Sequence, residues 1–417
     1  MERAELAQIL GRARPASSAH TSPPRCIIES EPRAFMDAFA EAVAGAGDIL
    51  LGDPRWGAHE REQLAAILAK APPAATTGWL ALPTGGSSGQ LKFARHDAQT
   101  IAAAVAGFQK HFAVERVQTV GVLPLHHVSG FMAWMRCAIS GGVYQPWDWK
   151  KLEDGNLPDL PRGDWFISLV PTQLSRLLKQ PRAAEWLRRF RAVFLGGAPA
   201  WPDLLDAAAD AYLPISLSYG MTETAAMVAA LRPDEFLQGH RSVGTPLPHA
   251  QLEIMSTGVV AVRAGSLCHG YYPEQCALAT WQTEDLGHFD ATRHLHIEGR
   301  RDAIIITGGK KVSPTEVENA LRSTGAFTDV AVIGLPDPEW GEIVVACYPR
   351  QATDRAITPA ASGAQLGPLL AHYKCPKLYL PLANWPRNAQ GKLQRPALVT
   401  AAQLQRAALA GAGGGAA

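Results

Sequence analysis

Short apolar runs alternate with helical patterns through the first half of the chain. Phe35, Phe39 and Val43 recur at the spacing of one helix face, whereas Ala192–Leu195 is an unbroken apolar run of strand length. Such alternation is typical of an α/β fold with a parallel sheet. The predicted strands are 79–82, 117–123, 165–170, 192–195 and 215–217, and the predicted helices are 34–43, 60–71, 97–112, 130–140, 173–178 and 203–211.

The pattern changes after Gly244 to short strands and turns, predicted at 251–255, 258–263, 281–283 and 294–297. A strand at 303–306, a turn at Gly308-Gly309, a helix and a strand at 330–333 follow. Ser313 precedes Pro314, and Glu316 comes three residues after Ser313, which predicts a capping box with proline at the first helical position. This part of the chain is typical of a separate small α+β unit.

We therefore expect an α/β protein with two domains. Residues 1–300 would form a large N-terminal domain of parallel-sheet α/β subdomains with a small β subdomain. Residues 301–417 would form a small, mobile α+β C-terminal domain. The stretch 351–367 is rich in Ala, Ser, Gly, Thr and Pro and predicts a loop, and the last residues, from about 404 to 417, predict a flexible tail.

Composition limits the possible partners and location. The 417 residues carry 39 basic and 38 acidic side chains, so net charge gives no reason to expect nucleic acid or an anionic membrane as a partner. No apolar run is long enough to span a bilayer, and Met1–Ala16 lacks the apolar core of a secretory signal. The six cysteines form no CxxC pair, and no Cys/His spacing typical of zinc sites occurs. We expect a cytoplasmic protein with reduced thiols.

A Gly/Ser-rich loop follows the predicted strand 79–82. Its glycines allow close approach of the backbone, and its N–H groups, hydroxyls and final lysine could surround a triphosphate. A kinase-type P-loop is excluded because Lys92 does not follow Gly89 directly. A simple surface loop remains the alternative. The candidate residues of this loop are Thr84, Gly85, Gly86, Ser87, Ser88, Gly89 and Lys92.

Four further segments carry candidate chemistry, although each alone could be a solvated turn. Ser218–Thr224 places a carboxylate beside a hydroxyl at a strand end, which suits Mg²⁺ on phosphate. Thr283–Gly287 places a carboxylate where it could take ribose hydroxyls. Glu298–Asp302 and Pro386–Arg395 are basic turns, and a lysine on a glycine-led loop can act as a mobile point charge.

These five segments, in this order, resemble the adenylate-forming superfamily of acyl-CoA synthetases, peptide-synthetase adenylation domains and luciferases. Thr84–Lys92 resembles its phosphate-binding motif, Tyr219–Glu223 its Y-G-x-T-E motif and Thr283–Gly287 its T-G-D motif. Gly299–Asp302 is similar to the G-R-x-D hinge, and Gly391-Lys392 to the C-terminal G-K motif. The resemblance extends from about Trp79 to Arg395.

The resemblance implies a reaction. Members of the superfamily activate a carboxylate with Mg·ATP, form an acyl-adenylate and pyrophosphate, and pass the acyl group to a thiol. By this resemblance Thr84–Lys92 would hold the β- and γ-phosphates, Thr222 would contact phosphate and Glu223 would hold Mg²⁺. Lys392 would stabilise the charge that develops between the attacking carboxylate and the α-phosphate.

The same resemblance implies the nucleoside contacts and a hinge. Gly196–Pro199, with Gly197 and Ala198, is similar to the adenine-side loop, and Tyr219 and Gly220 would lie against adenine. Asp285, assisted by Arg300, would bind the ribose hydroxyls. Asp302 would be the hinge at which the small domain rotates between the two half-reactions.

Three positions depart from the usual motifs. Gly85 stands where a hydroxyl residue is common, Leu91 where proline is common, and Glu284 where glycine is usual. These departures leave open a relative that binds nucleotide without turnover.

The acid is indicated by Leu123–Gly130, which resembles a stretch of acyl- and aryl-CoA ligases. The likeness is strongest to the ligases that act on 2-succinylbenzoate in menaquinone and phylloquinone biosynthesis. In them the position of His127 lies near the acyl pocket, so His127 is a candidate catalytic residue, with a packed core histidine as the alternative. Only about 22 residues follow Arg395, so we expect free CoA rather than an attached carrier domain as the acceptor; another acyl- or aryl-CoA ligase stays an alternative.

Overall fold

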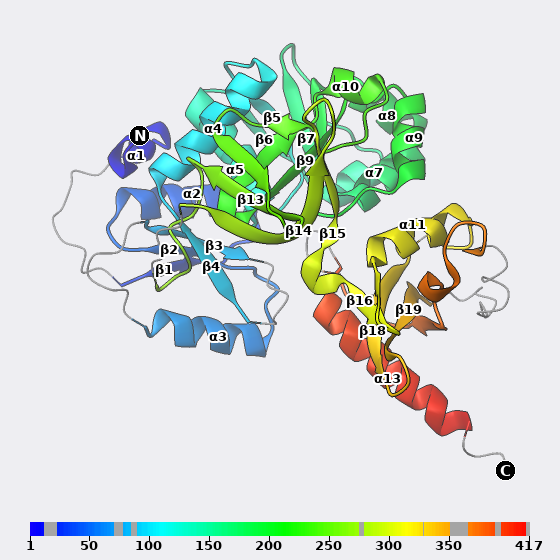
Figure 1. The fold of residues 1–417 in the computed structure, drawn as a ribbon. Coiled ribbons are helices and arrows are strands. Elements are labelled where there is room, and N and C mark those ends of the chain that lie inside the picture. Colours follow the sequence, from blue (N-terminus) through cyan, green and yellow to red (C-terminus); the bar gives the residue numbers. More distant parts are fainter. Residues whose placement is uncertain are drawn as a thin grey trace. The chain divides into compact units, whose positions relative to one another are not determined.

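The computed structural model describes residues 1–11, 23–70, 78–84, 90–274, 279–327, 329–350, 366–387 and 393–413, with side chains up to residue 409 (Figure 1). The chain divides into two compact units. The first comprises residues 1–200, 204–283 and 289–296, and the second comprises 201–203, 284–288 and 297–417.

A four-stranded sheet opens the first unit. Its strands are in sequence order, with β1, β2 and β3 parallel and β4 antiparallel to β3. The β3–β4 hairpin pairs Thr84 with Lys92, so the two ends of the Gly/Ser-rich loop are adjacent. The elements of this region are α1 (Arg3–Ile9), β1 (Arg25–Ile27), α2 (Pro32–Ala44), β2 (Ile49–Leu51), α3 (Ala58–Leu68), β3 (Leu80–Thr84) and β4 (Lys92–His96).

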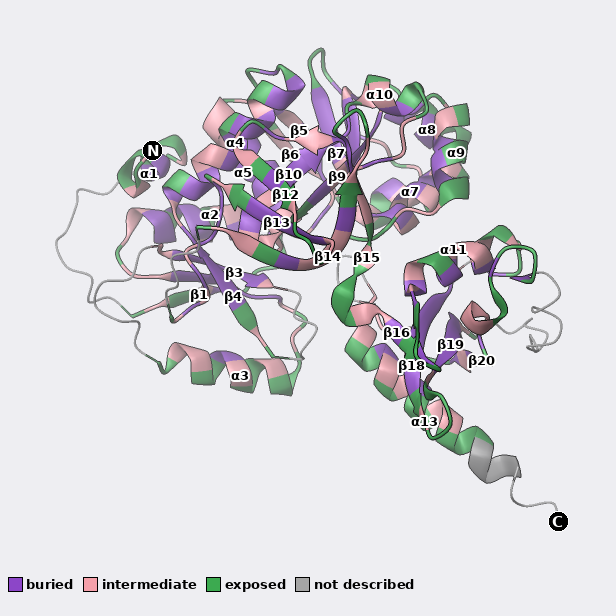
Figure 2. Cartoon of the chain, in the orientation of Figure 1, coloured by how far each residue is buried: buried purple, intermediate pink, exposed green. Residues whose placement is uncertain are grey.

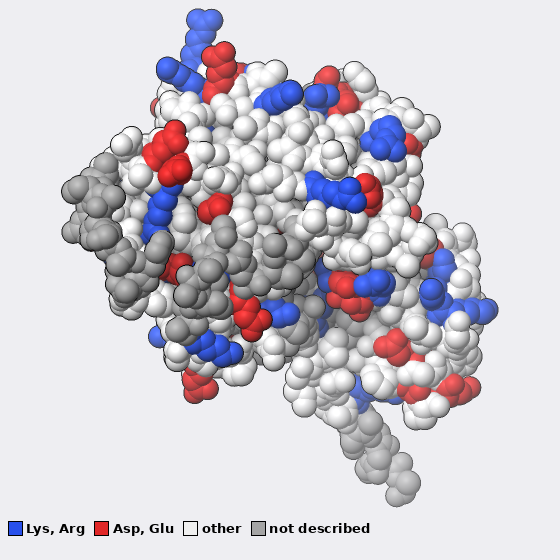
Figure 3. Space-filling view, turned by 60° about the vertical axis from the view of Figure 1, so that its left-hand side comes forward, with Lys and Arg blue, Asp and Glu red and all other residues white. Residues whose placement is uncertain are grey.

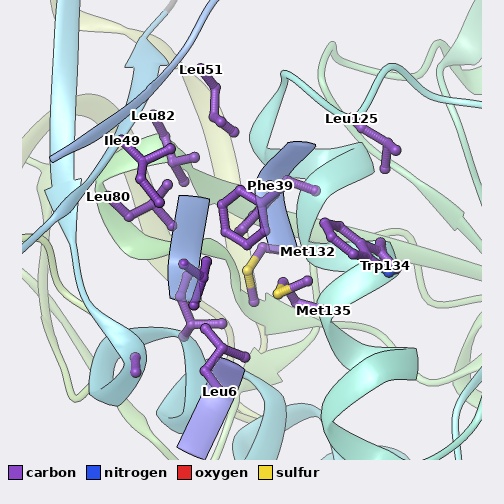
Figure 4. Packing of buried hydrophobic residues seen from close by; sticks show 14 of the residues in the cluster. Leu6, Phe39, Ile49, Leu51, Leu80, Leu82, Leu125, Met132, Trp134 and Met135 are labelled. Atoms are coloured by element: carbon purple, nitrogen blue, oxygen red, sulfur yellow. The ribbon is translucent and has the colours of Figure 1, made fainter. Parts of the chain in front are cut away.

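One hydrophobic core joins this sheet to the helices beside it. Figure 4 shows side chains of β2 and β3 facing Phe39 of α2, with Met132, Trp134 and Met135 of α5 (Val128–Ser140) close by. Phe39 is fully buried and meets Phe131 and Trp134 edge-on, with ring centroids 5.1 and 5.5 Å apart. The core thus fixes the helix that follows the Leu123–Gly130 stretch.

A seven-stranded sheet forms the centre of the first unit, in the order β11-β10-β9-β8-β7-β5-β6. The five strands from β9 to β6 are parallel, whereas β10 and β11 pair antiparallel. The parallel sheet confirms the predicted α/β class. Its elements are α4 (Ala98–Phe112), β5 (Gln118–Gly121), α5 (Val128–Ser140), β6 (Val143–Pro146), α6 (Trp149–Glu153), β7 (Trp165–Leu169), α7 (Pro171–Leu178), α8 (Pro181–Leu187), β8 (Ala192–Leu195), α9 (Pro202–Asp210), β9 (Ile215–Met221), η1 (Thr222–Thr224), β10 (Ala226–Ala230), α10 (Pro233–Leu237) and β11 (Thr245–Pro246).

A third sheet, β12-β13-β14-β15, contributes residues to both units. Its strands are β12 (Ala250–Ile254), β13 (Val259–Ala264), β14 (Trp281–Phe289) and β15 (Leu295–Arg300). Strands β14 and β15 are longer than the hydropathy pattern predicted. Polar residues at their ends also take part in strand pairing, and hydropathy does not reveal this.

The second unit is a sheet with a helix on each face. Alternate residues of β18 and β19 point to opposite sides: Val332 and Val344 pack with α11, and Ile333 and Val345 pack with α13. Figure 1 shows the two helices on either side of the strands. The elements are η2 (Arg301–Ala303), β16 (Ile305–Thr307), β17 (Lys310–Val312), α11 (Pro314–Ser323), β18 (Ala331–Asp337), β19 (Gly341–Pro349), η3 (His372–Lys374), β20 (Leu378–Leu382) and α13 (Arg395–Gly413).

Two local predictions are wrong. Ser313 is the N-cap of α11 and Pro314 its first residue, but the Ser313 side chain makes no capping hydrogen bond. The Glu316 carboxylate instead accepts a hydrogen bond from Lys374 Nζ at 2.5 Å, so a tertiary ion pair replaces the capping box. The flexible tail was placed too early, since α13 continues to Gly413; alanine-rich sequence favours helix. The predicted loop at 351–367 lies almost wholly outside the described residues.

Burial and surface charge follow the expected distribution. Figure 2 shows buried residues along the strands, whereas α3 is mostly intermediate and exposed. Figure 3 shows basic and acidic side chains interspersed on the face in view, in keeping with the balanced sequence charge. Among the described residues, the helices are too short or too polar to cross a bilayer.

Candidate functional site

The predicted motifs of the first unit gather at one edge of the seven-stranded sheet. Strands β5, β7, β8 and β9 are parallel, so the segments that follow them leave the sheet on the same side. These segments include Leu123–Gly130, Gly196–Pro199 and Thr222–Thr224. Ligands of open parallel sheets bind at this carboxyl edge.

The end of β9 is held in a strained turn that presents Glu223. The backbone of Ala225 and Ala226 has φ values of 50° and 76°, in the left-handed region that alanine rarely adopts. The buried Thr224 hydroxyl stabilises the turn, donating to Ala226 O at 2.6 Å and accepting from Met221 N at 3.1 Å. Glu223 is half-buried and keeps a fixed backbone position.

Thr222 connects this turn to the Gly/Ser-rich loop. Its hydroxyl donates to the Pro83 carbonyl at 3.4 Å, one residue before Thr84. The structure therefore brings together Thr222, Thr84 and Lys92, as the motif resemblance implied. Gly85–Gly89 of the same loop lie outside the described residues.

Tyr271 links the two charged groups of this edge, and sequence reasoning missed it. Its hydroxyl donates to Glu223 Oε1 at 2.7 Å, and Lys92 Nζ lies 5.7 Å from the centre of its ring. Burial and the Glu223 charge raise the pKa of Tyr271, so the phenol keeps the proton that it donates. Tyr271 is far from Lys92 in the sequence, and an isolated β-bridge between Tyr271 and Ala94 brings the two residues together. A local sequence pattern therefore could not have identified Tyr271.

His96 supports the same turn from inside the core. Its Nε2 lies 2.8 Å from the Thr222 carbonyl oxygen, and Nδ1 lies 3.2 Å from Thr100 Oγ1. Burial lowers the pKa of His96 to about 4. The imidazole is therefore neutral near pH 7, and the tautomer protonated at Nε2 donates to Thr222.

The predicted adenine-side loop begins where β8 ends, beside Tyr219. Leu195 of β8 pairs with Leu217 of β9, so Gly196–Pro199 and Ser218–Tyr219 leave neighbouring strands. Gly197 has a φ of +78°, and a Cβ at Gly196 would lie 3.2 Å from Ser218 Oγ. Gly197 and Ala198 are exposed, whereas Tyr219 is buried.

Asp285 and Arg300 lie together within the second unit. Arg300 Nη1 is 3.6 Å from Asp285 Oδ1, and the same guanidinium binds both carboxylate oxygens of Asp302 at 2.8 and 2.7 Å. These hydrogen bonds with Arg300 lower the pKa of Asp302. Glu284, which departs from the motif, receives two hydrogen bonds from Arg301 at 2.9 and 2.8 Å. Glu284, which stands where the motif usually has glycine, thus forms an exposed ion pair with Arg301 next to Asp285, the candidate ribose-binding carboxylate.

Gly391 and Lys392 lie outside the described residues. The chain on either side of them is fixed: Arg387 and Leu393 form an antiparallel bridge, and Gln394 N donates to Pro386 O at 2.8 Å.

His127 lies at the other end of the carboxyl edge, as the N-cap of α5. A Cβ at Gly130 would lie 2.2 Å from Pro124 O, so this tight turn requires glycine. His127 is mostly buried between His126 and Asp53, and burial lowers its pKa to about 3. It therefore has the surroundings of a packed histidine, although Leu123 and Gly130, on either side of it in sequence, line a narrow pocket.

A buried arginine beside this pocket was also missed. Arg136 lies one turn of α5 beyond Ala133, which lines the pocket, and its guanidinium carbon is 4.4 Å from the Phe108 ring centre. Its Nε is buried without a hydrogen-bond partner among the described residues, and the guanidinium carbon also lies 6.0 Å from the Phe194 ring centre. Burial lowers its pKa to about 10, so it remains a cation at pH 7.

His249 faces the same region. Both of its ring nitrogens are buried without a hydrogen-bond partner among the described residues. Burial, and to a smaller extent the nearby charge of Arg136, lowers the pKa of His249 to about 4. A Cβ at Gly107 would overlap the imidazole, so glycine makes room for it. Buried polar atoms without partners are costly, and together they mark a place where a ligand could bind. The sequence did contain a signal for this site, because Arg136 is a charged residue within the otherwise apolar helix α5.

The family model for AMP-binding enzymes matches residues 20–272, and the model for the AMP-binding enzyme C-terminal domain matches residues 316–392. The chain belongs to the AMP-binding enzyme family. The family resemblance inferred from the five motifs is thus confirmed.

Named relatives give the comparison more detail. A 2-succinylbenzoate–CoA ligase from Enterococcus faecalis is 30% identical over 334 residues, covering 76% of this chain and 68% of that protein. One from Oceanobacillus iheyensis is 32% identical over 286 residues, covering 66% and 59%. The chain spans between about half and two thirds of the length of the curated relatives it matches.

Solved structures share the fold. The o-succinylbenzoate CoA synthetase (MenE) from Bacillus subtilis, in complex with the acyl-adenylate OSB-AMP, has a TM-score of 0.76 at 22% identity, covering 95% of this chain and 91% of that one. ATP-bound MatB from Rhodopseudomonas palustris has a TM-score of 0.73 at 22% identity, with coverage of 95% and 91%. Such similar scores mean that the fold does not select the acid.

Proposed function

We propose that this protein is an ATP-dependent acid–CoA ligase that activates 2-succinylbenzoate through an acyl-adenylate and transfers it to CoA, releasing AMP and pyrophosphate. The observation that carries the proposal is the carboxyl edge of the first unit, where Thr84, Lys92, Thr222 and Glu223 converge. The substrate predicted from the sequence agrees with the names of the relatives.

The arrangement suits magnesium triphosphate. Tyr271 occupies Glu223 Oε1, which leaves Oε2 to face a cation, and carboxylate oxygen is a preferred Mg²⁺ ligand. Magnesium would neutralise phosphate charge and favour departure of pyrophosphate. Lys92 supplies a cation near the ring of Tyr271, whose hydroxyl donates to the same carboxylate, and Thr222 supplies a hydroxyl.

The choice of acid is supported by Arg136. The proposed substrate has a second carboxylate that is not activated, and burying it requires a cation and hydrogen-bond donors. Arg136 and His249 would offer both, and Arg136 follows the pocket-lining residue Ala133 by three positions on α5. A monocarboxylic acid would leave Arg136 with only the Phe108 and Phe194 rings beside its charge and no anion to pair with it.

The remaining roles stay predictions. Asp285 with Arg300 would hold the ribose, Lys392 would bridge the attacking carboxylate and the α-phosphate, and Asp302 would be the hinge. Free CoA as acceptor and the expected cytoplasmic location are likewise part of the proposal.

A screen of acids tests it. Pyrophosphate release should be measured with Mg·ATP and CoA and either 2-succinylbenzoate, benzoate, malonate or a fatty acid. We expect release with 2-succinylbenzoate and a CoA thioester as product. Release with benzoate or malonate but not with 2-succinylbenzoate would refute the acid, and ATP-dependent thermal stabilisation with no product from any acid would refute turnover.

A further inference from the structure

Asp53, His126 and His127 converge from two distant segments, and we call them the Asp53 cluster. Asp53 follows β2, and the two histidines lie between β5 and α5. His126 Nε2 is 3.5 Å from Asp53 Oδ1, and His127 Nε2 is 3.7 Å from Asp53 Oδ2. One potential ligand atom from each residue lies within 4.8 Å of the other two.

The two imidazole nitrogens that face Asp53 lack hydrogen bonds. His126 Nε2 and His127 Nε2 are buried without a partner among the described residues, and the His126 side chain is only 6% exposed. At 3.5 and 3.7 Å from the Asp53 oxygens the two nitrogens are too distant for good hydrogen bonds, so a further group between them would be favourable. Neutral imidazole is the form that binds metals.

The three residues are close enough to share one small ion. Zinc bonds of about 2.0–2.1 Å to nitrogen and oxygen place neighbouring ligand atoms roughly 3.3–3.4 Å apart. The separations of 3.5 and 3.7 Å run to the two different oxygens of Asp53, and one ligand atom from each residue lies within 4.8 Å of the other two, so the three side chains would draw closer around the ion. Two histidines and one carboxylate with a fourth position for water form a donor set that selects zinc or cobalt over magnesium.

Arg55 opposes the ion. It donates to Asp53 through Nε at 3.1 Å and through Nη2 at 2.9 Å. Its side chain is 56% exposed, so it can turn into solvent when a metal takes the carboxylate. Cation binding and the Arg55 pair therefore compete for Asp53.

We propose that the Asp53 cluster is a binding site for a transition-metal dication of the zinc type, separate from the candidate magnesium site at Glu223, with Arg55 as the competing cation. Binding itself does not depend on the proposed function. If that function holds, zinc would also inhibit acid activation, because it would fix the Leu123–Gly130 segment whose ends line the pocket.

The test uses the full chain without nucleotide. Zn²⁺ binding is measured by calorimetry, and Co²⁺ binding by the visible absorption bands of a tetrahedral cobalt complex. We expect one site, a tetrahedral Co²⁺ spectrum and no competition from millimolar Mg²⁺. Asp53→Asn and His126→Gln should each weaken binding at least about tenfold.

Arg55→Gln should change the Zn²⁺ affinity in the opposite direction, and a misfolded variant would not bind Zn²⁺ more tightly. Removing the exposed competitor should tighten Zn²⁺ binding about tenfold. His288→Gln, in an exposed pair with Glu298, is the matched control and should leave the affinity unchanged. Equal affinities in the unaltered protein, Asp53→Asn and His288→Gln, or weaker binding in Arg55→Gln, would overturn the proposal. Because no ATP or acid is present, failure here is distinct from failure of the ligase activity.

Discussion

Two regions of the first unit differ in how their polar groups are satisfied: the proposed phosphate side, with Lys92, Thr222 and Glu223, and the proposed acyl side, with His127, Arg136 and His249. On the phosphate side, Glu223 is hydrogen-bonded by Tyr271, and the turn beneath it is held by Thr224 and His96. On the acyl side, the imidazoles of His127 and His249 and the Arg136 guanidinium retain buried atoms without partners among the described residues.

This difference matches what each side has to recognise. Triphosphate and magnesium are the same for every member of the family, so a preorganised set of groups serves them. The acid varies, and unpartnered buried groups favour the one ligand that can pair with them. Four variants test this contrast, from the largest expected effect to the smallest.

Glu223→Gln should nearly abolish adenylate formation. Loss of the carboxylate weakens the hold on Mg²⁺ and should lower the rate of pyrophosphate release about 10³-fold, or roughly 4 kcal/mol. The rate is followed as a function of Mg²⁺ concentration. Glu153→Gln, in an exposed pair with Arg176, is the control. A fall of less than about fivefold in the rate of pyrophosphate release would show that Glu223 does not hold the metal.

Arg136→Met should change the choice of acid. Methionine fills similar space without charge, so folding is retained, while an unpaired substrate carboxylate costs about 2–3 kcal/mol. We expect kcat/KM for 2-succinylbenzoate to fall about 30- to 150-fold, with KM for ATP unchanged. An equal fall for benzoate, which lacks the second carboxylate, would contradict the assignment.

Tyr271→Phe should affect magnesium more than acid. The phenol orients the carboxylate that would bind the ion, and loss of such support typically weakens metal affinity about tenfold. Steady-state rates at varied Mg²⁺ should show a raised half-saturation concentration and little change in KM for the acid. Tyr272→Phe, at the neighbouring residue, serves as control, and identical Mg²⁺ curves for Tyr271→Phe and the parent would exclude this role.

His96→Gln should make stability less sensitive to acid. The folded-state pKa of His96, about 4, is below its usual value of 6.5, so the unfolded chain binds the extra proton between these values. Its contribution is complete above pH 6.5 and is lost as the pH falls toward 4, by about 1–2 kcal/mol at pH 5. Urea unfolding at pH 7 and pH 5 should show a smaller loss for the variant. Equal losses would mean that His96 is protonated in the fold.

Local signals predicted much of the fold and of the phosphate side. The strand Ala192–Leu195 was predicted at its observed bounds, because a run of buried apolar residues needs no distant information. The polar ends of β14 and β15 were missed, because strand pairing rather than hydropathy extends them. Tyr271 and His96 were missed as well, since each acts through a residue far along the chain.

The sequence by itself determined the family and the order of the motifs, and it supplied the proposal of ATP activation, because each motif carries its glycines, hydroxyls and charges within a few residues. Only the tertiary structure decided the surroundings of the acid. Asp53 meets His126 and His127 because one core joins β2 to Leu125 and the start of α5, and Arg136 lies over the Phe108 and Phe194 rings because α5 packs against a second core. The spacing of cysteines and histidines gave no zinc pattern, since the proposed ligands come from two segments far apart in the sequence, one of which supplies an aspartate.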